Sequence, residues 1–129
     1  MPTIYLERHI NAAAAQVWKQ VSDIRSPEHL TNMIHSVEVI GEGERSCVTE
    51  HGRIVERIVS VDEDRRRVAY TATESPFPIS HHNASMTVTQ VEDGCRLTWI
   101  TDVEPAAVAD ALAPVLAAEF DVIVSRLAM

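Results

Sequence analysis

Apolar residues recur at helical spacing along one long stretch of the chain, residues 105–129. At about 100° per residue they share one broad face, whereas Asp110, Asp121 and Ser125 fall on the opposite face. Pro114 lies inside the stretch and cannot donate a backbone hydrogen bond, so a bend is expected there. The pattern predicts a long amphipathic helix whose apolar face carries Val108, Leu112, Val115, Leu116, Phe120, Val122, Ile123 and Leu127.

Before this helix, apolar and polar residues mostly alternate, which is typical of strands with one buried face. Strands are expected over residues 3–10, 36–41, 45–50, 54–61, 66–73, 81–91 and 95–103. Two short helices are expected after the first strand: residues 12–22, with Asn11 as the N-cap, and residues 26–32, with Pro27 in the first turn. A sheet with one apolar face and an amphipathic helix bury these surfaces against each other. The sequence therefore predicts one α+β domain over residues 1–129.

Asp93-Gly94 is interpreted as a two-residue type I′ hairpin turn, which would set the register of the last two strands. It places Val88 opposite Trp99 and His82 opposite Pro105. The face that this pairing buries carries His82, Ala84, Met86, Val88, Leu97, Trp99, Thr101 and Val103, and the other face carries Asn83, Ser85, Thr87, Thr89, Arg96, Thr98 and Asp102.

The charge balance and the cysteine spacing exclude several classes of protein. A net charge of −8 argues against binding to nucleic acid or to anionic membranes. No apolar run approaches a membrane span, and the N-terminal residues are not expected to act as a signal peptide. Cys47 and Cys95 lack metal-ligand spacing and are expected to be reduced thiols of a cytoplasmic protein. His81 and His82 face opposite sides of one strand and cannot chelate together, so no metal is expected. There is no Gly-rich phosphate loop, and no cofactor is expected.

The order strand, two helices, six strands and long helix resembles the helix-grip fold of the START-like (SRPBCC) superfamily. Local matches are Ala15-Gln16-Val17-Trp18 with Val21-Ser22-Asp23, the 52–62 segment with Val55-Glu56-Arg57, the loop Pro76-Phe77-Pro78, and residues 94–99. The superfamily includes lipid-transfer domains, the birch-pollen allergen family, plant abscisic-acid receptors and bacterial polyketide cyclase/dehydrase proteins, and the last group looks closest. The resemblance implies a seven-stranded, curved antiparallel sheet that grips the C-terminal helix and leaves a cavity between them.

Three residues are candidates for catalysis by proton transfer: Glu56, Tyr70 and His82. Glu56 alternates with Ile54 and Ile58 on an inward face, although it could instead pair with a neighbouring arginine at a sheet edge. Tyr70 lies opposite Glu56 if residues 62–64 form a three-residue loop, and a core tyrosine is the alternative. His82 faces inward near the start of the final helix.

A ligand between sheet and helix would contact Trp99, Met86, Ile58, Thr101, Leu116, Glu119, Phe120 and Ile123. Glu119 interrupts the apolar stripe of the final helix; it turns to solvent if Pro114 rotates the helix, or adds a second carboxylate to the pocket.

The resemblance implies a protein that binds a small apolar or aromatic molecule, with a polyketide cyclase or aromatase as the leading hypothesis. A non-catalytic binder or lipid carrier remains an alternative, so enzymatic activity is left open. An interaction module like the chaperone co-factors of the superfamily is a third hypothesis, against which the polar outer face argues. A monomer or homodimer is expected.

Overall fold

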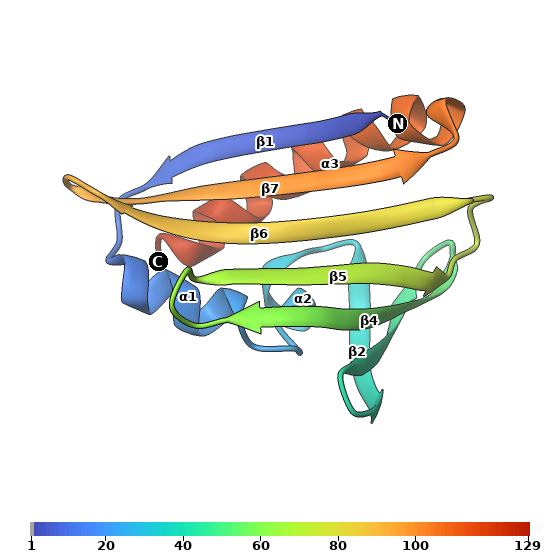
Figure 1. The fold of residues 1–129 in the computed structure, drawn as a ribbon, viewed down its shortest axis with the longest axis horizontal. Helices are drawn as coiled ribbons and strands as arrows, with labels where there is room; N and C mark the ends of the chain where they lie inside the picture. The colour runs from blue at the N-terminus through green and yellow to red at the C-terminus, as the bar shows by residue number, and fades with distance from the viewer. Residues whose placement is uncertain (1) are drawn as a thin grey trace.

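The computed structural model describes residues 2–129 and confirms the helix-grip fold. Seven antiparallel strands form one curved sheet in the order β1-β7-β6-β5-β4-β3-β2, and α3 lies across its concave face (Figure 1). The strands are β1 (Thr3–Ile10), β2 (Ile34–Gly41), β3 (Glu44–Thr49), β4 (Gly52–Asp62), β5 (Arg67–Glu74), β6 (His81–Val91) and β7 (Gly94–Glu104).

Two short helices, α1 (Ala14–Val21) and α2 (Pro27–Leu30), connect β1 to β2, as the sequence predicts. α1 buries Val17, Trp18 and Val21 on its inner side. The predicted N-cap was wrong: Ala13 holds that position with no side-chain hydrogen bond, and the helix begins three residues after Asn11.

The long helix α3 (Ala106–Leu127) continues through Pro114 without a break in helical structure. The bend expected at Pro114 stays a prediction. Within residues 2–129, none of the helices is long and apolar enough to cross a membrane.

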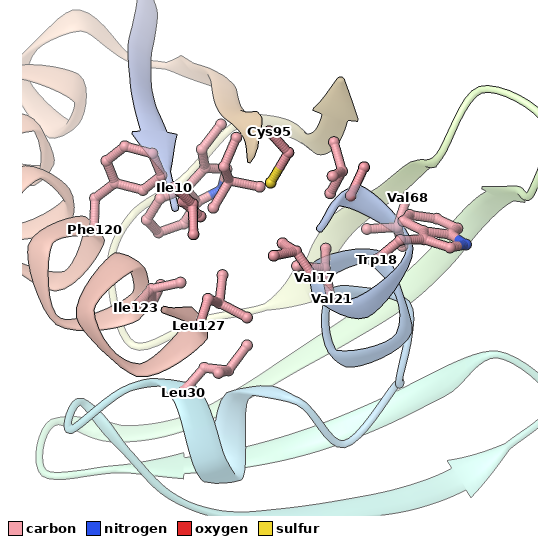
Figure 2. Packing of buried hydrophobic residues seen from close by; sticks show 14 residues of the cluster. Ile10, Val17, Trp18, Val21, Leu30, Val68, Cys95, Phe120, Ile123 and Leu127 are labelled. Carbon is pink, nitrogen blue, oxygen red and sulfur yellow. The ribbon is translucent and has the colours of Figure 1, made fainter. Parts of the chain in front are cut away.

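The apolar core lies where the C-terminal half of α3 meets α1 and the sheet (Figure 2). Phe120, Ile123 and Leu127 of α3 pack there with Ile10 at the end of β1 and Val17 of α1. Phe120, Leu127 and Val17 are each 0% exposed. Phe120, Leu127 and Val17 therefore leave no open space at this end of the molecule.

The predicted register of β6 and β7 was wrong by two residues. Trp99 pairs with Met86 rather than Val88, and His82 pairs with Val103 rather than Pro105. The tight connection consists of Glu92-Asp93, with Asp93 at φ 63°. Because a shift of two keeps every side chain on the same face, the predicted inner face is unchanged.

The register was wrong because Gly94 was interpreted as a turn residue. In the structure, a close contact with β1 explains why glycine occupies this position. A Cβ at Gly94 would lie 2.3 Å from the carbonyl oxygen of Ile10, and the backbone φ is 140°. Only glycine has the freedom for this conformation and this close approach.

The predicted pairing of Tyr70 with Glu56 was also wrong. The β4–β5 connection is longer than three residues and includes Arg66 at φ 52°, and a register shift follows Ile58. Tyr70 therefore pairs with Ile58, and Glu56 pairs with Ala72. Glu56 and Tyr70 still face the same side of the sheet, as diagonal neighbours.

We predict that Gly94→Ala lowers the free energy of unfolding by roughly 1–3 kcal/mol, because the backbone φ is unfavourable and the methyl group overlaps the β1 carbonyl. Gly41→Ala is the matched control, since a Cβ there meets nothing within 4 Å, and its effect should stay within about 0.5 kcal/mol. Urea unfolding of both variants measures the difference. Equal stabilities would contradict the close approach of β1 and β7.

Candidate functional site

A cavity of about 300 Å³ lies between the concave face of the sheet, the α1–α2 connection and the middle of α3. Most of its wall is apolar, with Ile58 and Met86 from the sheet and Leu116 and Ile123 from α3. A site of this kind binds by apolar contact and orients its ligand through a few polar groups. The position and chemistry of those polar groups therefore decide what the cavity can bind.

One polar or aromatic side chain from each of five neighbouring strands forms a strip along the cavity floor, which we call the polar strip. Its members are Arg45 on β3, Glu56 on β4, Tyr70 on β5, His82 on β6 and Trp99 on β7. Strand alternation on the concave face brings them together from distant parts of the sequence.

Arg45 and Glu56 form a buried ion pair at one end of the polar strip. The Arg45 Nε donates to Glu56 Oε1 at 2.8 Å, and the two side chains are only 7% and 13% exposed. Arg45 Nη1 also donates to the carbonyl oxygen of Ile24 at 2.8 Å, and its Cζ lies 5.1 Å from the centre of the Tyr70 ring. Arg45 therefore links two strands to the α1–α2 connection, and the carboxylate of Glu56 is engaged rather than free.

Tyr70 presents a hydroxyl proton at the cavity floor. Its oxygen accepts a hydrogen bond from Trp99 Nε1 at 3.0 Å, and no acceptor for its own proton is found among residues 2–129. Burial, and next the Glu56 carboxylate, raise the pKa of Tyr70 above its ordinary value. The phenol therefore stays protonated at neutral pH and can donate to a ligand oxygen.

His82 is a second donor on the strip. Its Nδ1 accepts the backbone N–H of Ala72 at 3.0 Å, so in the neutral ring the proton is on Nε2. Burial lowers the pKa of His82, while the nearby Glu56 carboxylate partly opposes this effect. The neutral imidazole can donate from Nε2 and lies beside Tyr70, with 6.0 Å between ring centres.

Glu119 lines the cavity from α3 rather than pointing away from it. Its carboxylate accepts the Thr31 hydroxyl and, at 3.2 Å, the backbone N–H of Asn32. These bonds join α3 to the end of α2. Glu119 therefore lies at the cavity rather than turning to solvent. Its hydrogen bonds also hold α2 and α3 together.

Of the predicted site residues, all but Phe120 line this cavity. Phe120 is 0% exposed and packs beneath Trp99, with 6.1 Å between ring centres. It belongs to the core because the apolar face of α3 is broad, and helical spacing alone does not separate cavity from core. The other candidates, which line the cavity, are Glu56, Tyr70, His82, Trp99, Met86, Ile58, Thr101, Leu116, Glu119 and Ile123.

Arg45 is a buried, charged residue of the cavity floor that the sequence analysis missed. The signal was present in the β3–β4 hairpin, in which Thr49 pairs with Gly52 across a two-residue connection. Counting back along both strands places Arg45 directly opposite Glu56. Glu56 faces inward and also pairs with a neighbouring arginine, so both interpretations of this residue apply. They are compatible because the ion pair lies inside the cavity.

The remaining nucleophile and metal candidates add no chemistry to the site. Cys47 is 0% exposed, and burial raises the pKa of its thiol to about 12, so it is not an activated thiolate. Within residues 2–129, no group of three or more His, Cys, Asp or Glu side chains could hold a metal ion.

This fold and cavity define a START-like helix-grip protein. The family of polyketide cyclase/dehydrase and lipid transport proteins matches residues 1–128, and the chain belongs to that family. Among curated proteins, no sequence matches the chain.

Several solved structures share the fold over nearly the whole chain. A protein of Thermobifida fusca is 26% identical with a TM-score of 0.83, covering 98% of this chain and 93% of its own. A START superfamily protein of Mycobacterium smegmatis is 12% identical with a TM-score of 0.79, covering 97% and 96%. The di-domain ARO/CYC BexL of the BE-7585A biosynthetic pathway is 13% identical with a TM-score of 0.85, and the match covers 98% of this chain but 46% of BexL.

We predict that Arg45→Met and Glu56→Gln each lower the free energy of unfolding by about 3–5 kcal/mol, because each leaves a buried charge without its partner. The double variant should lose less than the sum of the two, with a coupling energy above about 1 kcal/mol. The exposed pair Arg53–Glu74, 3.9 Å apart, is the control, and its cycle should give about 0–1 kcal/mol. Equal coupling energies in the two cycles would refute the buried pair.

The lowered pKa of His82 predicts a pH-dependent stability. The unfolded chain takes up a proton near pH 6.5 while the folded protein resists it, so the free energy of unfolding should fall as the pH drops below 6.5. His82→Gln should flatten this part of the profile. His29→Gln, at a histidine whose side chain is 69% exposed, should keep the wild-type profile. Identical slopes for wild type and His82→Gln would show that His82 is not protected from protonation.

Proposed function

We propose that the protein binds a small, mainly apolar molecule that carries a carbonyl oxygen, with that oxygen held at the polar strip. The observation that supports this most directly is the pair of neighbouring donors, Tyr70 and His82, on the floor of an otherwise apolar cavity. Two donors without an acceptor among residues 2–129 would be costly to bury unless water or a ligand oxygen accepts from them.

The size and lining of the cavity support a compact ligand. A volume of about 300 Å³ corresponds to roughly ten water molecules, at the lower end of the range for ligand pockets. Trp99 and Met86 give a flat, polarisable surface suited to an aromatic or conjugated ring. Glu56 is balanced by Arg45, so the site carries no unpaired charge from that pair and favours a neutral ligand.

A cyclase role is consistent with these groups and with the family. Hydrogen bonds from Tyr70 and His82 would withdraw electrons from a bound carbonyl and stabilise negative charge on its oxygen. The apolar walls would hold a flexible chain in the folded shape that ring closure requires. Glu56 and the His82 Nδ1 already form hydrogen bonds within the protein, so neither is a strong free base. The proposed role of the protein is therefore to orient the ligand and polarise its carbonyl group. A carrier that uses the same contacts without turnover remains the alternative.

We also propose that the protein is located in the cytoplasm. Cys47 and Cys95 are free and buried, which suits a reducing cytoplasm. The net charge of −8 favours a small-molecule partner over nucleic acid or an anionic membrane.

The test compares 2-acetylnaphthalene with 2-ethylnaphthalene, which has the same shape but no carbonyl. Wild-type protein should bind the ketone about tenfold more tightly by calorimetric titration, because the ketone accepts hydrogen bonds from the strip. Tyr70→Phe should remove most of this preference, whereas Tyr5→Phe, at a tyrosine that is 58% exposed, should keep it. Thermal melts establish that each variant is folded.

Equal affinity of wild-type protein for the two compounds would overturn the carbonyl assignment. No binding of either compound would overturn the proposed aromatic-ligand site.

A further inference from the structure

Beside the main cavity lies a second hollow of about 440 Å³, which we call the outer hollow. It lies between the first three turns of α3, the β3–β4 turn and the loop that follows β5. Four residues line both spaces: Met33, Ile54, Phe77 and Leu112. The two spaces therefore adjoin along an apolar boundary formed by these four side chains, which we call the neck.

The wall of the outer hollow is apolar almost throughout. From α3 it receives Ala107, Val108, Ala111 and Val115, which at about 100° per residue fall on one helix face. Val115 is 42% exposed and is one of the large apolar side chains at the surface. Burying such surface under a ligand is favourable.

The few polar groups of the outer hollow are already satisfied or lie at its rim. The Thr49 hydroxyl donates to the carbonyl oxygen of Gly52 at 2.7 Å and accepts the backbone N–H of His51 at 3.2 Å. The side chains of His51 and Glu50 are 61% and 76% exposed. Among the described side chains that line the outer hollow, the polar ones are therefore either hydrogen-bonded within the protein or exposed, in contrast to the polar strip.

We propose that the outer hollow is a second subsite for the same ligand and accepts an unbranched apolar chain attached to the carbonyl group. The inference rests on the proposed function, because the carbonyl at the polar strip fixes which end of the molecule enters the neck. The ligand class is thus an aryl or conjugated ketone with an aliphatic tail. The tail passes between Phe77 and Leu112 and packs against the alanine side of α3.

Two alanines of α3 leave room for the aliphatic chain of the ligand. Ala107 and Ala111 occupy successive turns of the same helix face, and both are exposed in the structure. A leucine at either position would project into the outer hollow without reaching the polar strip. Ala118 lies further along α3, is also exposed and lines neither space, so the same substitution there is a matched control.

The experiment measures the dissociation constants of 2-acetylnaphthalene and 2-hexanoylnaphthalene by calorimetric titration. Each buried methylene should tighten binding about fourfold, so the wild-type ratio of the two constants should be on the order of 100. Ala111→Leu should bring the ratio below about 10, and Ala107→Leu should do the same if Ala111→Leu does not fold. Ala118→Leu should keep the wild-type ratio.

The outcomes separate the two proposals. If wild-type protein binds 2-acetylnaphthalene but gains nothing from the longer chain, the outer subsite is refuted and the proposed function stands. If the gain survives leucine at both position 107 and position 111, the chain lies elsewhere and the subsite is likewise refuted. If neither ketone binds, the proposed function itself fails.

Discussion

The buried ion pair between Arg45 and Glu56 is the interaction on which the site depends. One guanidinium pairs with the carboxylate across β3 and β4, holds the carbonyl of Ile24 in the α1–α2 connection, and lies over the ring of Tyr70. It therefore fixes one wall of the cavity and one end of the polar strip together. Because the two charges neutralise each other, the apolar cavity can tolerate them, and Tyr70 and His82 remain as hydrogen-bond donors on the cavity floor.

The two halves of α3 differ in the size of their side chains, and this difference matches their surroundings in the fold. Its C-terminal half buries large side chains such as Phe120 and Leu127 in the closed core. Its N-terminal half carries the small residues Ala107 and Ala111 beside the outer hollow. Glu119, between these halves, is bonded to Thr31 and Asn32 rather than to the sheet. A single amphipathic helix thus closes one end of the sheet and leaves space at the other.

Alternation of apolar and polar residues was enough to predict the seven strands and the inward face of Glu56 and His82. It could not predict the pairing of the strands, because register depends on contacts between distant segments. Gly94 was interpreted as a turn residue, yet glycine is required at this position because the carbonyl oxygen of Ile10 on β1 leaves no room for a Cβ. Arg45 was missed for a related reason: a charged residue at the start of a strand is ordinarily solvent-exposed, and only its partner across the hairpin accounts for its burial.

The central claim is that a ligand carbonyl accepts hydrogen bonds at the polar strip, and carbon-13 NMR of the bound carbonyl tests it most directly. The account predicts that 2-acetylnaphthalene labelled at its carbonyl carbon shows a downfield shift on binding, relative to an apolar solvent. Tyr70→Phe should move the signal partly back, because one of two donors is lost. A bound signal at the apolar-solvent position in wild-type protein, unchanged by Tyr70→Phe, would contradict the account.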